Sequence, residues 1–205
     1  MKTAPEHSVG DSYFEALFDG NDDPWAFRHR WYEQRKRDLT LAVLPRQRYA
    51  SVFEPGCANG ELGAALAERC DRLLCADTSA RAVALAQARL KPFAHAEVRQ
   101  QRLPEQWPQA RFDLIVISEM AYYLSPEDLD RLIARIRDSL EDDGQVLACH
   151  WRPAIEGAPL TAEAVHSRFA ACLDMTRLVT HDEPDFLLDL WSRDPRSLAE
   201  QEQLR

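Results

Sequence analysis

The segment at residues 112–118, Phe-Asp-Leu-Ile-Val-Ile-Ser, is apolar at nearly every position and has the length of a strand. A strand that is apolar on both faces has to be covered on both faces, as in the parallel sheet of an α/β domain. A membrane-spanning helix needs about 20 apolar residues, and no apolar run approaches that length. The segment therefore predicts a buried strand with layers of helices on both sides.

Short apolar segments alternate with helical patterns along most of the chain, and alternation of this kind predicts parallel strands with helices on both faces of the sheet. The last two strands are separated only by a tight turn and are expected to form an antiparallel hairpin. We expect a three-layer, doubly wound α/β domain with a mostly parallel seven-stranded sheet. The predicted strands are 51–54, 73–76, 96–100, 112–118, 145–151, 176–181 and 185–192. The predicted helices are 60–69, 79–90, 125–140, with Gly144 as its stop, and 161–173.

The residues before this alternation are expected to be an addition to the sheet. Residues 1–11 are polar and predicted to be a disordered tail. Residues 12–205 are predicted to form a single domain, of which 12–45 are cap helices. A helix is predicted from Asp23, its N-cap, to Leu39. Its aromatic residues either dock this helix on the sheet or form a lid over a ligand: Trp25, Phe27 and Trp31.

The overall composition limits the partners of the chain. A net charge of −9 does not suit a protein that grips a phosphate backbone, so nucleic acid is not expected as a partner. The five cysteines include no CxxC pair, which predicts buried free thiols without a disulfide framework or a zinc site. Since the N-terminus lacks the apolar core of a secretory signal, we predict a cytoplasmic monomer or homodimer. We expect it to act on a small molecule, with no metal and no membrane contact.

The turn after the first strand reads Glu54-Pro-Gly56-Cys57-Ala58-Asn-Gly60. Glycine lets the backbone turn sharply and lets a ligand approach closely. A dinucleotide site would read GxGxxG, and Ala58 interrupts that pattern, which disfavours a nicotinamide-dependent oxidoreductase. Glu54 would repel a pyrophosphate but suits an ammonium, and the N–H groups of the turn could meet a carboxylate. S-adenosylmethionine carries both groups.

The second strand ends at Asp77, followed by Thr78. A carboxylate at this position can accept hydrogen bonds from both hydroxyls of a ribose. Alternatively, Asp77 helps to cap the helix that begins at Ser79. The glycine turn and this acid together predict a bound adenosine ligand.

The stretch after the third strand is expected to meet the adenine. Many domains of this kind have an aspartate here, but this chain has Gln101, Arg102 and Leu103. Gln101 could accept a hydrogen bond from the adenine amino group through its amide oxygen. A backbone N–H near Leu103 could serve a ring nitrogen.

The acceptor side is expected after the fourth strand. Glu119 follows Ser118 and is predicted either to orient the substrate and accept a proton or to hold the structure by hydrogen bonds. One of Tyr122 and Tyr123 is expected in the core, and we assign the other, Tyr123, to the acceptor pocket. His150 ends the fifth strand and is either a base or sugar contact, or a partly buried, hydrogen-bonded histidine.

These residues resemble the NodS-like class I methyltransferases. The resemblance covers about residues 20–150 and depends on the glycine turn, Asp77, residues 112–119, Tyr122-Tyr123-Leu124 and Tyr32-Glu33-x-Arg35. The founding member of that family N-methylates the deacetylated glucosamine end of a chito-oligosaccharide. The resemblance implies a cofactor loop at Glu54, Gly56 and Gly60, and a ribose acid at Asp77. It also implies that Tyr32 and Arg35 close over the cofactor, while Arg102 stands where the family tends to have its adenine-side aspartate.

The resemblance thus implies an S-adenosylmethionine-dependent methyltransferase that leaves S-adenosylhomocysteine as product. The expected reaction is N-methylation of an amino sugar, an oligosaccharide or a related amine. O-methylation of a hydroxyl on a similar substrate remains an alternative. A third reading is a non-catalytic module that binds an adenosine ligand for a partner protein.

Overall fold

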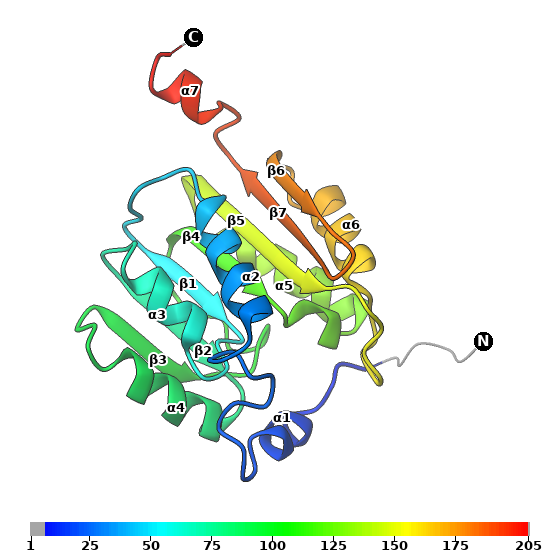
Figure 1. The fold of residues 1–205 in the computed structure, drawn as a ribbon. Helices are drawn as coiled ribbons and strands as arrows, with labels where there is room; N and C mark the ends of the chain where they lie inside the picture. Colours follow the sequence, from blue (N-terminus) through cyan, green and yellow to red (C-terminus); the bar gives the residue numbers. More distant parts are fainter. Residues whose placement is uncertain (1–6, 205) are drawn as a thin grey trace.

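A seven-stranded sheet forms the centre of the computed structural model, which describes residues 7–204 (Figure 1). The strand order is β3-β2-β1-β4-β5-β7-β6. Neighbours from β3 to β5 run parallel, and β7 runs antiparallel to both β5 and β6. The predicted doubly wound α/β fold with its antiparallel hairpin is therefore confirmed. The strands are β1 (Val52–Pro55), β2 (Leu73–Asp77), β3 (Ala96–Gln100), β4 (Phe112–Ser118), β5 (Leu140–Trp151), β6 (Thr176–Asp182) and β7 (Phe186–Ser192).

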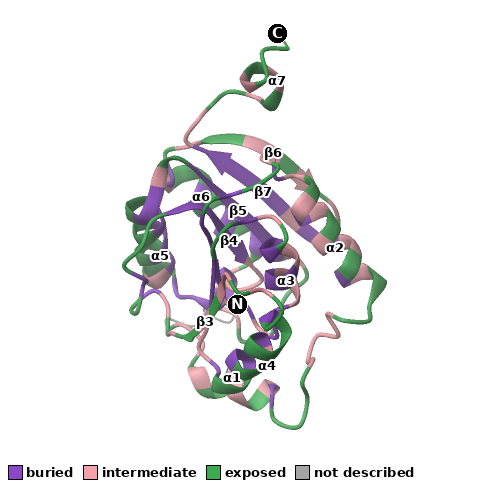
Figure 2. Ribbon diagram, turned by 90° about the vertical axis from the view of Figure 1, so that its left-hand side faces the viewer, coloured by how far each residue is buried: buried purple, intermediate pink, exposed green. Residues whose placement is uncertain are grey.

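Helices cover both faces of the sheet, with α2, α3 and α4 on one side and α5 and α6 on the other (Figure 1). Alternate residues of each central strand point to opposite faces: Val52 and Leu114 join the core under the first group, Phe53 and Ile115 the core under the second. The central strands are buried, whereas the edge strands β3 and β6 are largely intermediate or exposed (Figure 2). The helices are α1 (Asp11–Leu17), α2 (Trp31–Ala42), α3 (Glu61–Ala67), α4 (Ala80–Leu90), the 3₁₀ turn η1 (Ala121–Tyr123), α5 (Pro126–Ser139), α6 (Ala162–Cys172) and α7 (Leu198–Gln201).

The helix α5 illustrates how local sequence sets these elements. Ser125 is its N-cap, and the Ser125 side chain accepts a hydrogen bond from the backbone N–H of Asp128. Leu129, Leu132 and Ile136 recur at helical spacing and are buried against the sheet. Each such side chain contributes about 1.5–3 kcal/mol by leaving water. Packing of this apolar face, rather than helix propensity, holds α5 in place.

Two predicted helix boundaries are wrong. The helix expected from Asp23 begins at Trp31 instead. The Asp23 carboxylate does accept hydrogen bonds from the N–H groups of Phe27 and Arg28 (2.8 and 3.1 Å), but Ala26 adopts a φ of 59°, so the segment is a turn. The stop expected at Gly144 also differs, since α5 ends at Ser139 and Gly144 lies within β5.

The predicted tail at 1–11 is wrong for its second half. The backbone N–H of Val9 donates to the carbonyl of Tyr123 (2.8 Å), and the Ser8 hydroxyl donates to Asp128 (2.5 Å). The helix α1 follows at once, and Glu15 accepts hydrogen bonds from the backbone N–H of Ala80 and the side chain of Ser79 at the start of α4. Residues 1–6 lie outside the described residues. The N-terminal segment thus spans from η1 to α4.

The strand order changes direction between β1 and β4, which are neighbours in the sheet. Chains leaving these two strands turn toward opposite faces, and the crevice between them is the usual ligand site of an open α/β sheet. Figure 1 shows α1 and the loop that follows it at this end of the sheet. Within residues 7–204, no helix combines the length and the apolar character that a membrane span requires.

Candidate active site

A cavity of about 470 Å³ lies beyond the carboxyl ends of β1, β2, β4 and β5. Most of the site residues predicted from the sequence line it, so the structure brings them together. They are Trp25, Tyr32, Glu54, Gly56, Cys57, Asp77, Thr78, Gln101, Arg102, Leu103, Ser118, Glu119 and Tyr123. Three predicted residues do not line it, namely Arg35, Gly60 and His150.

The glycine turn adopts the backbone conformations that its residues predict. Gly56 and Gly60 have φ angles of 72° and 80°, in the left-handed region that favours glycine. A Cβ atom on Gly56 would also come within 2.9 Å of the Cβ of Met120. The N–H groups of Gly56, Cys57 and Ala58 are already bonded to the carbonyl of Ala76 or the carboxylate of Asp77. The expectation that the turn offers these N–H groups to a cofactor carboxylate is therefore wrong.

Glu54 lies at the bottom of the cavity, only 3% exposed. The thiol of Cys75 donates to its Oε2 at 3.3 Å. A Cβ on Gly63 of α3 would come within 2.7 Å of that same oxygen. Burial raises the pKa of Glu54 to about 8, against the opposing effect of the Cys75 hydrogen bond. The glycine at position 63 thus makes room for an acid beneath α3.

Asp77 serves the structure and also faces the cavity. Its carboxylate accepts hydrogen bonds from the backbone N–H of Ala58 (2.9 Å) and of Ser79 (3.0 Å). Burial raises its pKa, although these backbone hydrogen bonds oppose the rise. The capping role considered from the sequence is present. Because each carboxylate oxygen accepts more than one hydrogen bond, the same group can still receive a ligand.

The stretch predicted to meet the adenine contains one unsatisfied acceptor. The side-chain N–H of Gln101 donates to the carbonyl of Gln106 (2.8 Å). Its other atom, Oε1, is buried and has no hydrogen-bond partner among the described residues. Arg102 is turned toward Asp11 of α1, with 2.7 Å between Nη1 and Oδ1. Gln101 is therefore the residue in this stretch that leaves an acceptor for a ligand.

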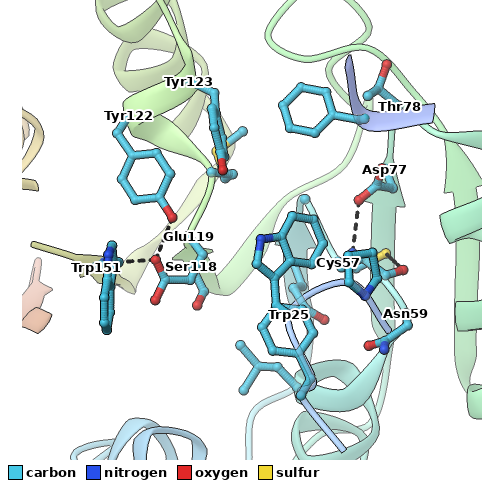
Figure 3. A pocket seen from close by; sticks show the side chains of 18 of the residues that line it. Trp25, Cys57, Asn59, Asp77, Thr78, Ser118, Glu119, Tyr122, Tyr123 and Trp151 are labelled. Atoms are coloured by element: carbon cyan, nitrogen blue, oxygen red, sulfur yellow. Dashed lines mark hydrogen bonds between the residues drawn. The ribbon is translucent and has the colours of Figure 1, made fainter. Parts of the chain in front are cut away.

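Glu119 stands on the opposite side of the cavity (Figure 3). The residue has a φ of 56°, a conformation that costs a non-glycine residue free energy. Its Oε2 accepts hydrogen bonds from the hydroxyl of Tyr122 (2.7 Å) and the backbone N–H of Trp151 (2.8 Å), and Lys36 Nζ lies 2.6 Å from Oε1. Both oxygens are engaged, which matches the structural reading of Glu119.

The helix α2 contributes three lining residues with unusual surroundings. Lys36 lies between Glu119 and Glu33, with 3.0 Å from its Nζ to Oε2 of Glu33. Burial alone would lower the pKa of Lys36, but the two carboxylates raise it above its ordinary value. The Tyr32 hydroxyl is buried without a hydrogen-bond partner among the described residues.

Two of these α2 residues, Glu33 and Lys36, were given no role in the site by the sequence analysis, although Glu33 belongs to the motif that carries the family resemblance. They lie one and four positions after Tyr32, and residues four apart share a helix face. Applying that spacing to Tyr32 would have selected Lys36 in place of Arg35.

Arg35 was predicted to close over the cofactor, and this prediction is wrong. Its guanidinium faces away from the cavity and makes two hydrogen bonds, of 2.7 and 3.0 Å, to the Glu183 carboxylate in the turn between β6 and β7. Arg35 lies three residues after Tyr32, which suggested that both side chains face the cavity. The way in which α2 packs on the sheet instead places the Arg35 side chain against the hairpin.

The prediction of His150 as a base or sugar contact is also wrong. The residue is fully buried, and its Nε2 accepts from the N–H of Ala121 at 3.3 Å. Its Nδ1 lies 3.0 Å from Nε2 of His166, whose Nδ1 lies 2.7 Å from Asp189. Burial, followed by the neighbouring His166, holds the pKa of His150 well below its ordinary value. The ring is therefore a neutral part of the core.

Aromatic rings form the rest of the wall. Tyr123 packs edge to face on Phe14 of α1, with 5.1 Å between ring centroids. Trp25 stacks on Phe27 at 5.3 Å and meets Phe18 edge to face. Residues 7–204 contain no group of three or more His, Cys, Asp or Glu side chains placed to hold a metal ion. The cavity thus combines an apolar wall with carboxylates at both ends.

Comparison with known proteins identifies the family. The family model of nodulation protein S (NodS) matches residues 16–178. Nodulation protein S of Sinorhizobium fredii is 34% identical over 133 residues, which are 62% of this chain and 56% of that protein. The chain thus matches little more than half the length of that relative.

Solved structures show the same fold. The N-methyltransferase NodS of Bradyrhizobium japonicum WM9, in complex with S-adenosyl-L-homocysteine, superposes with a TM-score of 0.81 at 25% identity, over 90% of this chain and 98% of that one. A Pseudomonas syringae protein proposed to be a methyltransferase is 61% identical, with a TM-score of 0.73, over 80% of this chain and 99% of that one. The match of the family model over most of the chain, together with the shared sheet topology, places this chain in the NodS family of class I methyltransferases.

Proposed function

We propose that the chain is an S-adenosylmethionine-dependent methyltransferase of a small molecule, and that it methylates the amino nitrogen of an amino sugar or a related amine. One observation carries the proposal. A single cavity joins the glycine turn and Asp77 to the carboxylates of Glu33 and Glu119. In addition, the solved relative from Bradyrhizobium japonicum is named an N-methyltransferase and was crystallised with S-adenosylhomocysteine.

The polar atoms of the nucleotide side fit the cofactor. Gln101 Oε1 and Asn59 Oδ1 are buried acceptors without a partner among the described residues, and both residues line the cavity. Gln101, together with a backbone N–H near Leu103, would hold the adenine, and Asp77 would hold the ribose hydroxyls. Glu54 and Asn59 would hold the amino end. Gln101 and Asn59 would each receive a cofactor donor at an acceptor atom that burial otherwise leaves unpaired at a cost, while the backbone N–H would donate to an adenine ring nitrogen.

When bound, the cofactor supplies an electrophilic methyl group to a nucleophile in line with its sulfonium. The protein's own residues then have to hold the nucleophile close and aligned, which lowers the barrier by several kcal/mol. Glu119 contributes by fixing the wall, since it ties Tyr122, Lys36 and the Trp151 backbone together. The rings of Tyr123 and Trp25 keep water from the reacting atoms.

The charge of the cavity favours a cationic or neutral acceptor. Eight acidic and four basic side chains line it, and the whole chain has a net charge of −9. A polyphosphate or nucleic acid acceptor would meet repulsion here. We propose a cytoplasmic monomer or homodimer, without a metal, that meets small molecules rather than membranes.

The first test is isothermal titration with S-adenosylhomocysteine, with NADH as the control ligand. We expect micromolar binding of S-adenosylhomocysteine alone. Methyl transfer would then be assayed with a glucosamine oligomer and with its N-acetylated counterpart. Transfer to the amine only supports N-methylation, and transfer to both would assign the reaction to a hydroxyl. Absence of S-adenosylhomocysteine binding would remove the enzyme proposal altogether.

A further inference from the structure

The wall of the cavity formed by α2 carries a buried group of three charges. Glu33 and Lys36 are 9% and 7% exposed. Lys36 Nζ lies 3.0 Å from Glu33 and 2.6 Å from Glu119. One cation between two carboxylates leaves a net charge of −1 where water is scarce. An uncompensated buried charge is costly, so a cationic ligand group would stabilise this wall.

A buried hydroxyl lies beside these charges. Tyr32 precedes Glu33 on α2 and lines the same cavity, and its OH group lacks a partner within residues 7–204. A hydroxyl can accept a hydrogen bond from an ammonium and donate one to a sugar oxygen. Tyr32 therefore presents an unsatisfied hydroxyl to a ligand, next to the Glu33 carboxylate that is paired with Lys36.

We propose that Tyr32 and Glu33 form the subsite for the ammonium group of the methyl acceptor, and that Glu33 takes the proton which this group must lose before methyl transfer. The inference rests on the proposed function as an amine methyltransferase. It goes beyond that function by assigning the acceptor contacts to α2 rather than to Glu119, Tyr123 or His150.

The other ionisable groups of the cavity are less suited to this task. Both oxygens of Glu119 are engaged by Lys36, Tyr122 and the backbone of Trp151. Lys36 is held in its charged form by the two carboxylates, and Glu54 lies at the nucleotide end of the cavity, where we assign it to the amino end of the cofactor.

Glu33 itself is poised to bind a proton. Its charged neighbours are Lys36 and Arg37 on α2 and Glu119, which follows β4 and meets the same Lys36. Burial raises the pKa of Glu33, while Lys36 and Arg37 oppose the rise. A buried carboxylate of this kind accepts a proton from an ammonium more readily than an exposed one.

The proposed step balances. The ammonium gives one proton to the Glu33 carboxylate and becomes a neutral amine with a free electron pair. That pair forms the bond from nitrogen to the methyl carbon, the bond from this carbon to the sulfonium sulfur breaks, and its electrons stay on sulfur. The product is a methylammonium, and the Glu33 proton returns to water.

The test uses the full chain saturated with S-adenosylhomocysteine. A glucosamine oligomer and its N-acetylated counterpart are titrated by calorimetry into wild type, Glu33→Gln, Tyr32→Phe and the control Asp38→Asn. Asp38 is an exposed acid of the same helix that does not line the cavity. We expect wild type and Asp38→Asn to prefer the amine. Glu33→Gln should lose about tenfold in affinity for the amine, and Tyr32→Phe about threefold, while both keep the wild-type affinity for S-adenosylhomocysteine.

Turnover gives a second readout. In Glu33→Gln, kcat should fall about a hundredfold, within the range of an acid–base contribution, and the acidic limb of its pH profile should vanish. Tyr32→Phe removes only one oxygen and should raise KM with little change in kcat. If wild type binds both oligomers equally, or if Glu33→Gln binds and methylates the amine like wild type, the assignment is overturned. If Glu33→Gln methylates the amine like wild type, the role of Glu33 is refuted, but methyl transfer to the amine still supports the proposed function.

Discussion

The Nδ1 atom of His150 lies 3.0 Å from the Nε2 atom of His166, and neither residue lines the cavity. Only one placement of protons satisfies the whole chain of contacts. Asp189 accepts from Nδ1–H of His166, Nε2 of His166 accepts from Nδ1–H of His150, and Nε2 of His150 accepts from the N–H of Ala121. This chain joins η1, which carries Tyr122 to Glu119, to the strand β7.

Removing the middle of this chain should destabilise the fold. His166→Ala removes the hydrogen bonds of this ring to Asp189 and to His150 in the core, so the free energy of unfolding should fall by about 3 kcal/mol. Urea denaturation followed by circular dichroism measures this loss. His29→Ala, at an exposed position, is the control and should be neutral. A loss below about 1 kcal/mol in His166→Ala would mean that the chain of contacts has little energetic importance.

The stability should depend on pH through Glu54. Its folded pKa, about 8, lies above the unfolded value near 4.3, so its stabilising effect is complete below the unfolded pKa and is lost as the pH rises toward 8. Relative to Glu54→Gln, the wild type should lose about 1.4 kcal/mol of unfolding free energy per pH unit within this window. Urea midpoints at pH 5, 6.5 and 8, without ligand, test this. A difference that does not vary with pH would contradict the assignment.

Asp77 should contribute directly to cofactor affinity. Asp77→Asn keeps one acceptor oxygen for the backbone but removes the charge that strengthens the ribose hydrogen bonds, so S-adenosylhomocysteine should bind about 1–3 kcal/mol more weakly. Calorimetry measures the change. Asp130→Asn removes an exposed acid on α5 that pairs with Arg168 and should bind as wild type does. Equal affinities in all three proteins would assign Asp77 to capping alone.

Gln101 should select the adenine amino group. Its buried, unpartnered Oε1 can accept from that group but not from the carbonyl oxygen of an inosine analogue. Wild type should therefore prefer S-adenosylhomocysteine over S-inosylhomocysteine by about 1 kcal/mol or more. Gln101→Met keeps the volume without the acceptor and should reduce this preference. If Gln101→Met still preferred S-adenosylhomocysteine over S-inosylhomocysteine as strongly as wild type does, the contact between Gln101 and the adenine amino group would be refuted.

Much of the fold could be predicted from local pattern. Every predicted strand is present, and the helices predicted to begin at Ser79, Ser125 and Thr161 are capped by these residues. The predictions that failed concern segments whose conformation is set by contacts with residues far away in the sequence. The segment 8–17 is held by bonds to η1 and α4 that no local pattern encodes.

That the residues expected to meet a nucleotide line one cavity was also predictable, because Gly56 and Asp77 occupy fixed places at the ends of two adjacent strands. The acceptor side was not. On α2 a rotation of one residue, about 100°, separates Arg35 at the hairpin from Lys36 in the cavity. That rotation is set by how the helix packs on the sheet, and His150 was likewise turned into the core by its partners on α6 and β7.

The pairing of Arg35 with Glu183 joins residues that are 148 positions apart. A ribosome therefore releases α2 long before it makes the turn that anchors this helix. Until β6 and β7 have emerged from the ribosome, β5 lacks its antiparallel neighbour β7. The helix α2, which carries Glu33 and Lys36, then also lacks the contact between Arg35 and Glu183. The strands β1, β2 and β4, which end at Gly56, Asp77 and Glu119, are thus synthesised well before the turn that anchors α2. Termination of the chain before the turn between β6 and β7 would remove this anchor together with the side chains that β7 gives to both cores, among them Phe186 and Trp191.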